Sequence, residues 1–203
     1  MKPSILAIFA AAGVAIAGCG GIGASASPPL SANSFAAATA SAQTAAAAYC
    51  KQTGGELELR RPVYGSNSSK FLFLAGDRTF CQYTSKKDGS RIHILLETLY
   101  TTKPSLAALA YILKPAVGSC SGNPASCYCS LLGGSDQFGG TSGSGGGWYE
   151  KNAIDQTLEA CIFPDMSSID SWGLTYHAEG IIRGINLEKV MRYKYPGALR
   201  IAR

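Results

Sequence analysis

One pattern of cysteines and glycines occurs twice in this chain of 203 residues. In each copy a Tyr-Cys pair is followed, after three further residues, by Gly-Gly, at 49–55 and again at 128–134. A later cysteine follows each pair at nearly the same interval, at Cys81 and Cys161. Because several anchors recur in the same order, we interpret the sequence as an internal duplication.

The two copies, at 45–116 and 117–203, share an order of expected elements. A helix carries the Tyr-Cys pair and ends at Gly-Gly, because glycine readily adopts the left-handed conformation that closes a helix. The sequence therefore predicts an α+β fold of two small tandem disulfide-stabilised repeats, each with a helix packed on a short antiparallel sheet and a closing helix. The predicted strands are 56–60, 70–74, 79–83 and 92–100, the closing helices are 104–113 and 187–192, and the predicted helix caps are Asn123, with Pro124 after it, and Asn186.

The first residues predict export. Lys2 precedes an uncharged apolar run at 5–16, which is shorter than the roughly 20 residues that a membrane-spanning helix needs. The Ile-Ala-Gly-Cys that ends at Cys19 resembles the lipobox of bacterial lipoproteins, whose cysteine becomes the first residue and is acylated on its sulfur. The alternative is an ordinary signal peptide with a cysteine at its cleavage site. We expect a lipoprotein signal peptide at 1–18 and a flexible Ala/Ser/Gly/Pro tether at 19–44.

The resemblance to lipoproteins implies palmitate-type acyl chains on Cys19, and two or more chains are needed because one binds a membrane only marginally. In lipoproteins an Asp after the cysteine favours retention at the inner membrane. Gly20 stands there instead, which favours the outer membrane. We therefore expect a membrane-anchored protein of the cell envelope whose repeats lie in the periplasm.

Six cysteines remain of the seven when Cys19 is set aside, and an even number in an exported chain indicates disulfides. Equivalent cysteines in two copies should form equivalent bonds, which leaves one further pair. Helix geometry agrees, because residues two apart, such as Cys127 and Cys129, face opposite ways around a helix. The predicted bonds are Cys50–Cys81, Cys129–Cys161 and Cys120–Cys127.

The second copy carries a motif of a known family. It reads Asn-Pro-Ala-x-x-Tyr-Cys from 123, then Gly-Gly, then Cys-Ile-Phe-Pro-Asp-Met-Ser from 161, then Trp172. Over roughly 123–176 this resembles the hemolysin-like domain family of unknown function, which consists of small bacterial envelope proteins. The first copy matches more weakly and lacks Asn-Pro-Ala and the Trp, and Met166 replaces the family's turn glycine. The resemblance implies no established activity or catalytic residue.

Residues suited to catalysis are few. The two histidines, His93 and His177, lie at non-equivalent places in the copies, which favours surface or hydrogen-bonded histidines over a catalytic base. No Gly-x-Ser-x-Gly occurs. The glycine-rich run at 139–147 lacks the Lys-Ser/Thr of a phosphate-binding loop, so we expect a flexible hairpin loop there.

Two carboxylate pairs and the cysteines offer the remaining chemistry. Glycosidase-type pairs would be Glu150 with Asp155 or Asp165 with Asp170, although turn chemistry explains Asp165 better. Cysteines and a histidine could form a zinc site, but in an exported chain oxidation of the same cysteines to disulfides competes with zinc binding. We therefore expect no catalytic residue, no cofactor and no metal.

The formal charge is +5, and it falls to +4 when Lys2 leaves with the signal peptide. No basic stripe is visible, so we expect no nucleic-acid partner. Trp148 and Tyr149 follow the glycine-rich run and are the candidate partner-binding surface, with packing over a sheet as the alternative. We expect Trp172 in the core.

These observations favour a non-enzymatic binding or structural module, anchored to a membrane by lipid and contacting a protein partner in the envelope. One alternative is an inhibitor of a secreted or host hydrolase, because compact disulfide domains present rigid loops. Another is an envelope hydrolase.

Overall fold

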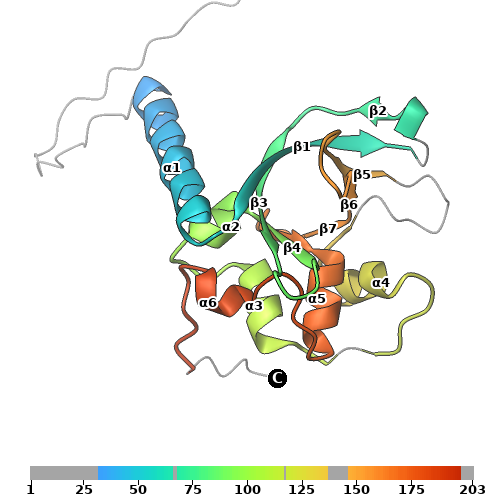
Figure 1. Ribbon diagram of the computed structural model, residues 1–203. Helices are drawn as coiled ribbons and strands as arrows, with labels where there is room; N and C mark the ends of the chain where they lie inside the picture. The colour runs from blue at the N-terminus through green and yellow to red at the C-terminus, as the bar shows by residue number, and fades with distance from the viewer. Residues whose placement is uncertain (1–31, 66–67, 117, 137–145, 198–203) are drawn as a thin grey trace, which may run out of the picture.

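The computed structural model describes residues 32–65, 68–116, 118–136 and 146–197, and it confirms an α+β protein with an antiparallel sheet (Figure 1). The helices are α1 (Ala32–Gln52), α2 (Leu96–Tyr100), α3 (Leu106–Leu113), α4 (Pro124–Leu131), α5 (Ser171–Ala178) and α6 (Leu187–Val190), with a 3-10 turn at Ser68–Lys70. The strands are β1 (Glu56–Tyr64), β2 (Leu72–Phe73), β3 (Arg78–Thr84), β4 (Arg91–Leu95), β5 (Gly146–Tyr149), β6 (Thr157–Leu158), β7 (Ala160–Ile162) and β8 (Ser168–Asp170).

A single sheet takes strands from both halves of the chain. Its order is β6-β5-β1-β3-β4-β8-β7, and β2 also pairs with β1. The halves meet where Ile94 of β4 pairs with Ile169 of β8, and again where β1 pairs with β5. The prediction of one small sheet for each half is therefore wrong. Two separate sheets would leave edge strands with unpaired backbone N–H and C=O groups. Pairing between the halves gives these groups hydrogen-bond partners.

The sheet curls until its two ends nearly meet. β6 lies at one end of the strand order and finishes at Leu158, whereas β7 lies at the other end and begins at Ala160. Only Glu159 separates these two edge strands in the chain. β1 makes the corner, because its first half pairs with β3 and its second half with β5. The result is a nearly closed, barrel-like sheet with a lumen.

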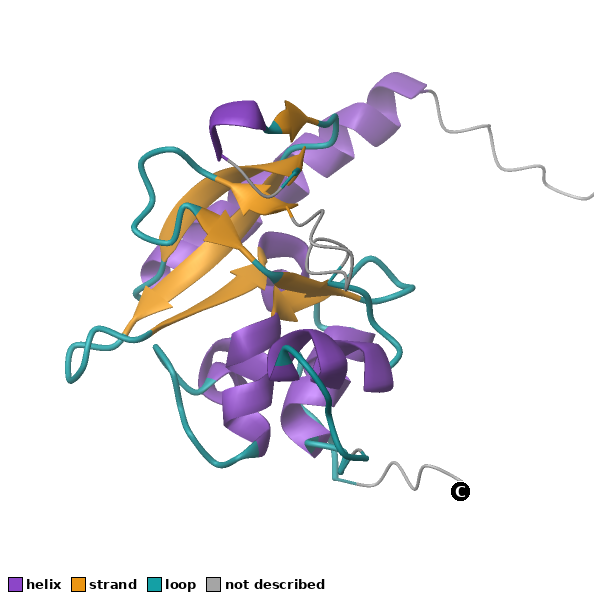
Figure 2. Ribbon diagram, turned by 90° about the vertical axis from the view of Figure 1, so that its right-hand side faces the viewer, coloured by secondary structure: helices purple, strands orange, loops and turns teal. Residues whose placement is uncertain are grey.

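Alternation along the strands sends side chains to two different cores. On β3 and β4, Cys81 and Ile94 belong to the core between the sheet and the helices, whereas Phe80 and Leu95 point into the lumen. Figure 2 shows most of the helices gathered below the sheet, with the long helix α1 running up behind it. The lumen core is smaller and also contains Trp148, Leu158 and Ala160.

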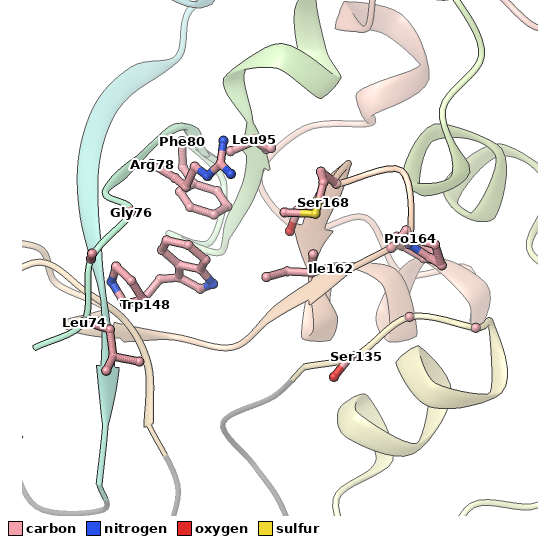
Figure 3. Close-up of a pocket in the computed structure, with 16 residues that line it drawn as sticks. Leu74, Gly76, Arg78, Phe80, Leu95, Ser135, Trp148, Ile162, Pro164 and Ser168 are labelled. Atoms are coloured by element: carbon pink, nitrogen blue, oxygen red, sulfur yellow. The ribbon is translucent and has the colours of Figure 1, made fainter. Parts of the chain in front are cut away.

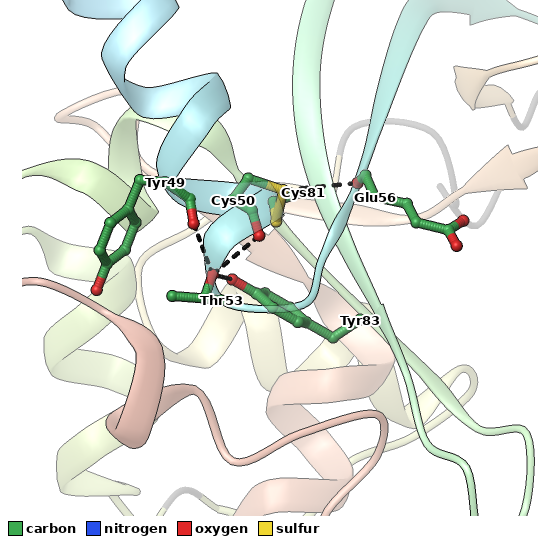
Figure 4. Close-up of a disulfide and its surroundings, with 6 residues drawn as sticks. All are labelled: Tyr49, Cys50, Thr53, Glu56, Cys81 and Tyr83. Atoms are coloured by element: carbon green, nitrogen blue, oxygen red, sulfur yellow. Dashed lines mark hydrogen bonds between the residues drawn. A yellow bond between two sulfur atoms is a disulfide. The ribbon is translucent and has the colours of Figure 1, made fainter.

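Three disulfides join the pairs that the sequence predicts: Cys50–Cys81, Cys120–Cys127 and Cys129–Cys161. The first attaches α1 to β3 (Figure 4), and the third attaches α4 to β7. Glycine is required beside both bonds. A Cβ on Gly55 would collide with the sulfur of Cys81, and a Cβ on Gly134 would collide with that of Cys161. Both Gly-Gly pairs therefore end a helix and then let the chain pass a disulfide.

Local signals predicted most element ends. Strand 79–83 is confirmed within β3, and the closing helices are confirmed as α3 and α6. Asn123 and Asn186 cap α4 and α6 through their side chains.

Two predicted segments are wrong. Segment 92–100 is not one strand, because β4 ends at Leu95 and α2 begins at Leu96. Leu96 and Leu99 are buried at helical spacing, which a short apolar run does not distinguish from a strand. The segment 19–44 is not tether throughout, because the alanine-rich helix α1 begins at Ala32. No helix in the described ranges is both long and apolar enough to span a membrane.

Candidate functional site in the barrel lumen

One half of the lumen is charged. The lumen ion cluster consists of Glu58 and Arg60 of β1, Gln82 of β3, His93 of β4 and Asp170 of β8. Arg60 is fully buried, at 0% exposure. Its Nε donates to Glu58 Oε2 at 2.7 Å, and its Nη1 donates to the carbonyl oxygens of Trp148 and Asp155, each at 2.9 Å. These bonds offset the large cost of removing a guanidinium from water.

His93 lies between two carboxylates. Its backbone N–H donates to Asp170 Oδ2 at 2.9 Å, and its ring Nδ1 lies 3.5 Å from the same oxygen. Ring Nε2 lies 3.3 Å from Glu58 Oε2 and 3.1 Å from Gln82 Oε1. Burial opposes a charge on the ring, but the bonds to Asp170 and Glu58 outweigh burial and raise the pKa of His93 above 6.5.

The same contacts act on Glu58. Burial alone would raise the pKa of its carboxyl, but the hydrogen bond and charge of His93 and the charge of Arg60 lower it below 4.5. The cluster therefore favours a charged histidine beside a charged carboxylate.

The cluster resembles a catalytic dyad only in its residue types. A Ser-His-Asp site needs a nucleophile on the histidine nitrogen that faces away from the aspartate. Here the side chains within reach of Nε2 are those of Glu58, Gln82 and Arg60. Asp170 is held in addition by the N-terminus of α5, where it accepts the N–H of Gly173. These contacts favour a structural role for the cluster.

The other half of the lumen is an apolar cavity of about 540 Å³, shown in Figure 3 and called the barrel pocket below. The pocket lies beside the ion cluster along the same strands. Phe80 is two residues from Gln82 on β3, Leu95 is two residues from His93 on β4, and all four side chains are on the inward face. The volume is within the range of small-molecule sites. Its apolar wall includes Phe80, Leu95, Trp148, Ile162, Phe163 and Met166.

Ser168 and Arg78 give the pocket its polarity, and Met166 forms part of its rim. Ser168 is 2% exposed, and its hydroxyl has no hydrogen-bond partner in the described part of the chain. Arg78 is half-buried in the wall, and no carboxylate of the described residues forms an ion pair with it. Met166 stands at the rim, 56% exposed, with a left-handed backbone at φ 64°.

The predicted partner surface is divided by the sheet. Trp148 is only 7% exposed and packs on Phe80 with ring centroids 5.7 Å apart, so its assignment to a surface is wrong. The alternation of β5 turns it into the lumen. Tyr149 faces the other way, is half-buried and contacts the rings of Phe71 and Phe73. Trp172 is half-buried rather than in the core, and its ring lies 5.8 Å from that of Tyr176.

The other predicted chemical residues are engaged in structure. Asp155 forms an ion pair with Arg91, and Asp165 accepts the backbone N–H of Ser167 in a turn. His177 is buried and stacks on Tyr111 at 3.7 Å. The described residues contain no group of His, Cys, Asp and Glu that could hold a metal ion. Cys19 and most of the glycine-rich run, up to residue 145, lie outside the described residues.

Sequence reasoning missed the lumen because its residues come from strands far apart in the chain. The one available signal was the alternation of Glu58 and Arg60 with apolar residues, which puts two charges on one face of a strand.

Comparison with known proteins adds no neighbour: no family model, curated protein or solved structure matches this sequence.

Proposed function

We propose that the protein is a lipid-anchored, non-enzymatic protein of the cell envelope that binds an apolar ligand in the barrel pocket. The observation that carries this proposal is a cavity of about 540 Å³ whose wall is apolar and is built from strands of both halves. Binding sites for small molecules are concave, mostly apolar and few in a protein.

Rigid surroundings support binding in this pocket. The disulfide at Cys161 fixes β7, which carries Ile162, and the contacts of His93 with Glu58 and Asp170 tie β1, β4 and β8 together beside the cavity. The side chains around a preformed cavity lose little conformational entropy when a ligand enters. More of the contact energy therefore contributes to affinity.

A neutral fluorescent probe tests the binding function. We expect N-phenyl-1-naphthylamine to gain fluorescence with saturation when mixed with the Cys19→Ser chain, which is purified without detergent. Ala75 lines the pocket from an exposed loop, so Ala75→Trp should fill the cavity without disturbing the core and abolish the signal. Ile154→Trp, at a position that is 80% exposed and outside the pocket, is the matched control. Equal signals from both variants would refute binding in the barrel pocket.

The membrane anchor is a separate part of the proposal. Its support is the charged residue, short apolar run and Ile-Ala-Gly-Cys sequence before residue 20. We expect cells that express the chain to incorporate labelled palmitate into it, and Cys19→Ser to remove the label. Labelling that persists in Cys19→Ser would place the lipid elsewhere.

We also propose that the fold arose by duplication of one hemolysin-like unit. Each half has a helix-to-strand disulfide, and each has a glycine pressed against it, Gly55 and Gly134. The halves also meet at equivalent strands, because Ile94 and Ile169 pair with the strand cysteines Cys81 and Cys161 as well as with each other.

A further inference from the structure

We propose that the ligand of the barrel pocket is a monoacyl carboxylate, whose aliphatic chain lies on the apolar wall and whose carboxylate binds Arg78 and Ser168. This inference rests on the proposed binding function and adds the chemical class of the ligand.

Arg78 supplies an unused positive charge. It lies where the barrel pocket meets a smaller hollow of about 310 Å³, and it lines both. The carboxylates of Glu97 and Asp165 also line the smaller hollow, but they accept hydrogen bonds from Gln43 and from the backbone of Leu106. The other arginines of the described strands are paired with carboxylates: Arg60 with Glu58, Arg61 with Asp77, and Arg91 with Asp155. Arg78 has no such carboxylate among the described residues.

Ser168 supplies an unused hydroxyl. Its backbone N–H donates to Thr98 Oγ1 at 3.0 Å, which fixes the residue, but its own Oγ bonds to no described group. A buried hydroxyl without a partner is uncommon in proteins and destabilises the fold unless a ligand or solvent bonds to it. This oxygen lines the barrel pocket.

Sheet register places the two polar groups on the same wall. Phe80 of β3 pairs with Leu95 of β4. Because Ile94 pairs with Ile169 and the two strands are antiparallel, Leu95 lies opposite Ser168 of β8. Phe80, Leu95 and Ser168 therefore form a row across three strands. Arg78 lies two residues from Phe80 and so on the same face. Figure 3 shows Arg78, Leu95 and Ser168 along one side of the cavity.

The number of donors selects a carboxylate. A guanidinium can give two parallel N–H bonds to the two oxygens of one carboxylate, and it neutralises one negative charge. The Ser168 hydroxyl adds a third donor. A phosphate monoester would bring further negative charge, for which the pocket wall offers no second cation, and an uncompensated charge in an apolar cavity is costly.

The test uses Trp148 as a reporter inside the pocket. The chain has two tryptophans, so Trp172→Phe in the Cys19→Ser background leaves Trp148 as the fluorophore. We would titrate this protein with dodecanoate, dodecanol and dodecyl phosphate, each below its micelle concentration. Dodecanoate should bind at least about tenfold more tightly than dodecanol, because bonds to a charged group are strong in an apolar site.

Variants then separate charge from shape. Arg78→Gln should remove the preference for dodecanoate and leave the affinity for dodecanol within about twofold, since only the charged contact is lost. Arg78→Lys should retain part of the preference, because a lysine keeps the charge without the two parallel bonds. Ser168→Ala should weaken dodecanoate alone. Arg61→Gln removes an equal charge at an exposed position outside the pocket and should change neither ligand. Thermal unfolding verifies that each variant is folded.

The outcomes distinguish this inference from the proposed function. Equal binding of acid and alcohol, or an unchanged preference in Arg78→Gln, would overturn the carboxylate and leave an apolar binding pocket. Tighter binding of dodecyl phosphate would overturn it as well. Failure of every aliphatic ligand, while the naphthylamine probe still binds, would overturn the acyl class alone. Failure of the probe too would overturn both.

Discussion

At the scale of single residues, a strained backbone marks the pocket rim. Met166 and Lys114 are the non-glycine residues of the described chain with positive φ, at 64° and 46°. A non-glycine residue in this left-handed backbone region costs about 1–2 kcal/mol of stability. Replacement by glycine recovers only part of that cost, because glycine loses more conformational entropy when the chain folds. The sequence shows a methionine at position 166, but it could not show that its thioether lines a cavity.

Replacing these two residues separates strain from binding. Met166→Gly and Lys114→Gly should each raise the free energy of unfolding by about 0.5–1 kcal/mol, measured in urea, because both relieve the same conformation. Only Met166→Gly should weaken ligand binding, since Met166 lines the pocket and Lys114 does not. Destabilisation by Met166→Gly would show that its side-chain contacts outweigh the strain.

The two histidines make opposite contributions to pH-dependent stability. The pKa of His93 is raised above 6.5, so its contribution is complete below pH 6.5 and is lost as the pH rises through the raised value. Burial and the charge of Lys114 lower the pKa of His177, against the attraction of Glu188. Its contribution is complete above pH 6.5 and is lost as the pH falls through the lowered value.

Single variants expose each profile, because the chain has no third histidine. Between pH 5 and pH 8, in buffers at about one-unit steps, His177→Gln should become less stable as the pH rises above 6.5. His93→Gln should become less stable as the pH falls below 6.5. Urea unfolding at each pH measures both. The same slope in both variants would contradict the opposed environments of the two rings.

At the scale of elements, the sequence predicts what local chemistry decides. The asparagine caps, the glycine helix ends and the three cysteine pairs each depend on a few neighbouring residues or on the recurrence of the Tyr-Cys and Gly-Gly pattern. The change from β4 to α2 at Leu95 depends on packing in the core, because the apolar run that contains it suits a strand or a helix equally well.

The disulfides should differ in their contributions to stability. Cys50–Cys81 closes 31 residues and Cys120–Cys127 closes 7. In the chain-entropy account, replacing the first pair by alanines should cost about 3–4 kcal/mol and replacing the second about 2 kcal/mol. Urea unfolding of the two double variants measures this difference. Equal losses would mean that local packing, rather than loop closure, sets their contributions.

At the scale of the whole molecule, the barrel depends on pairing between residues far apart in the chain. Neither the cysteine repeat nor the strand signals show that β4 pairs with β8 or β1 with β5. For that reason the recurring cysteine and glycine pattern was readable in the sequence, whereas the shared sheet, its lumen and the pocket were not.

The shared sheet predicts that the halves fold together. The full chain should unfold in one cooperative transition by calorimetry, whereas segments 32–116 and 117–203, expressed separately, should lack a folded near-ultraviolet circular dichroism spectrum. Each isolated half would expose the strand edge that its partner normally covers. A half that is folded and unfolds cooperatively by itself would contradict a single barrel.

The location of the ligand tests the central claim most directly. An aliphatic ligand with a photoreactive diazirine, irradiated with the protein and followed by peptide mapping, reports which side chains it touches. Labels on Phe80, Leu95, Ile162 and Met166, lost in Ala75→Trp, are the predicted result. Labels confined to the exposed side chains Tyr64, Leu72 and Phe73, unchanged by Ala75→Trp, would contradict a binding site inside the barrel.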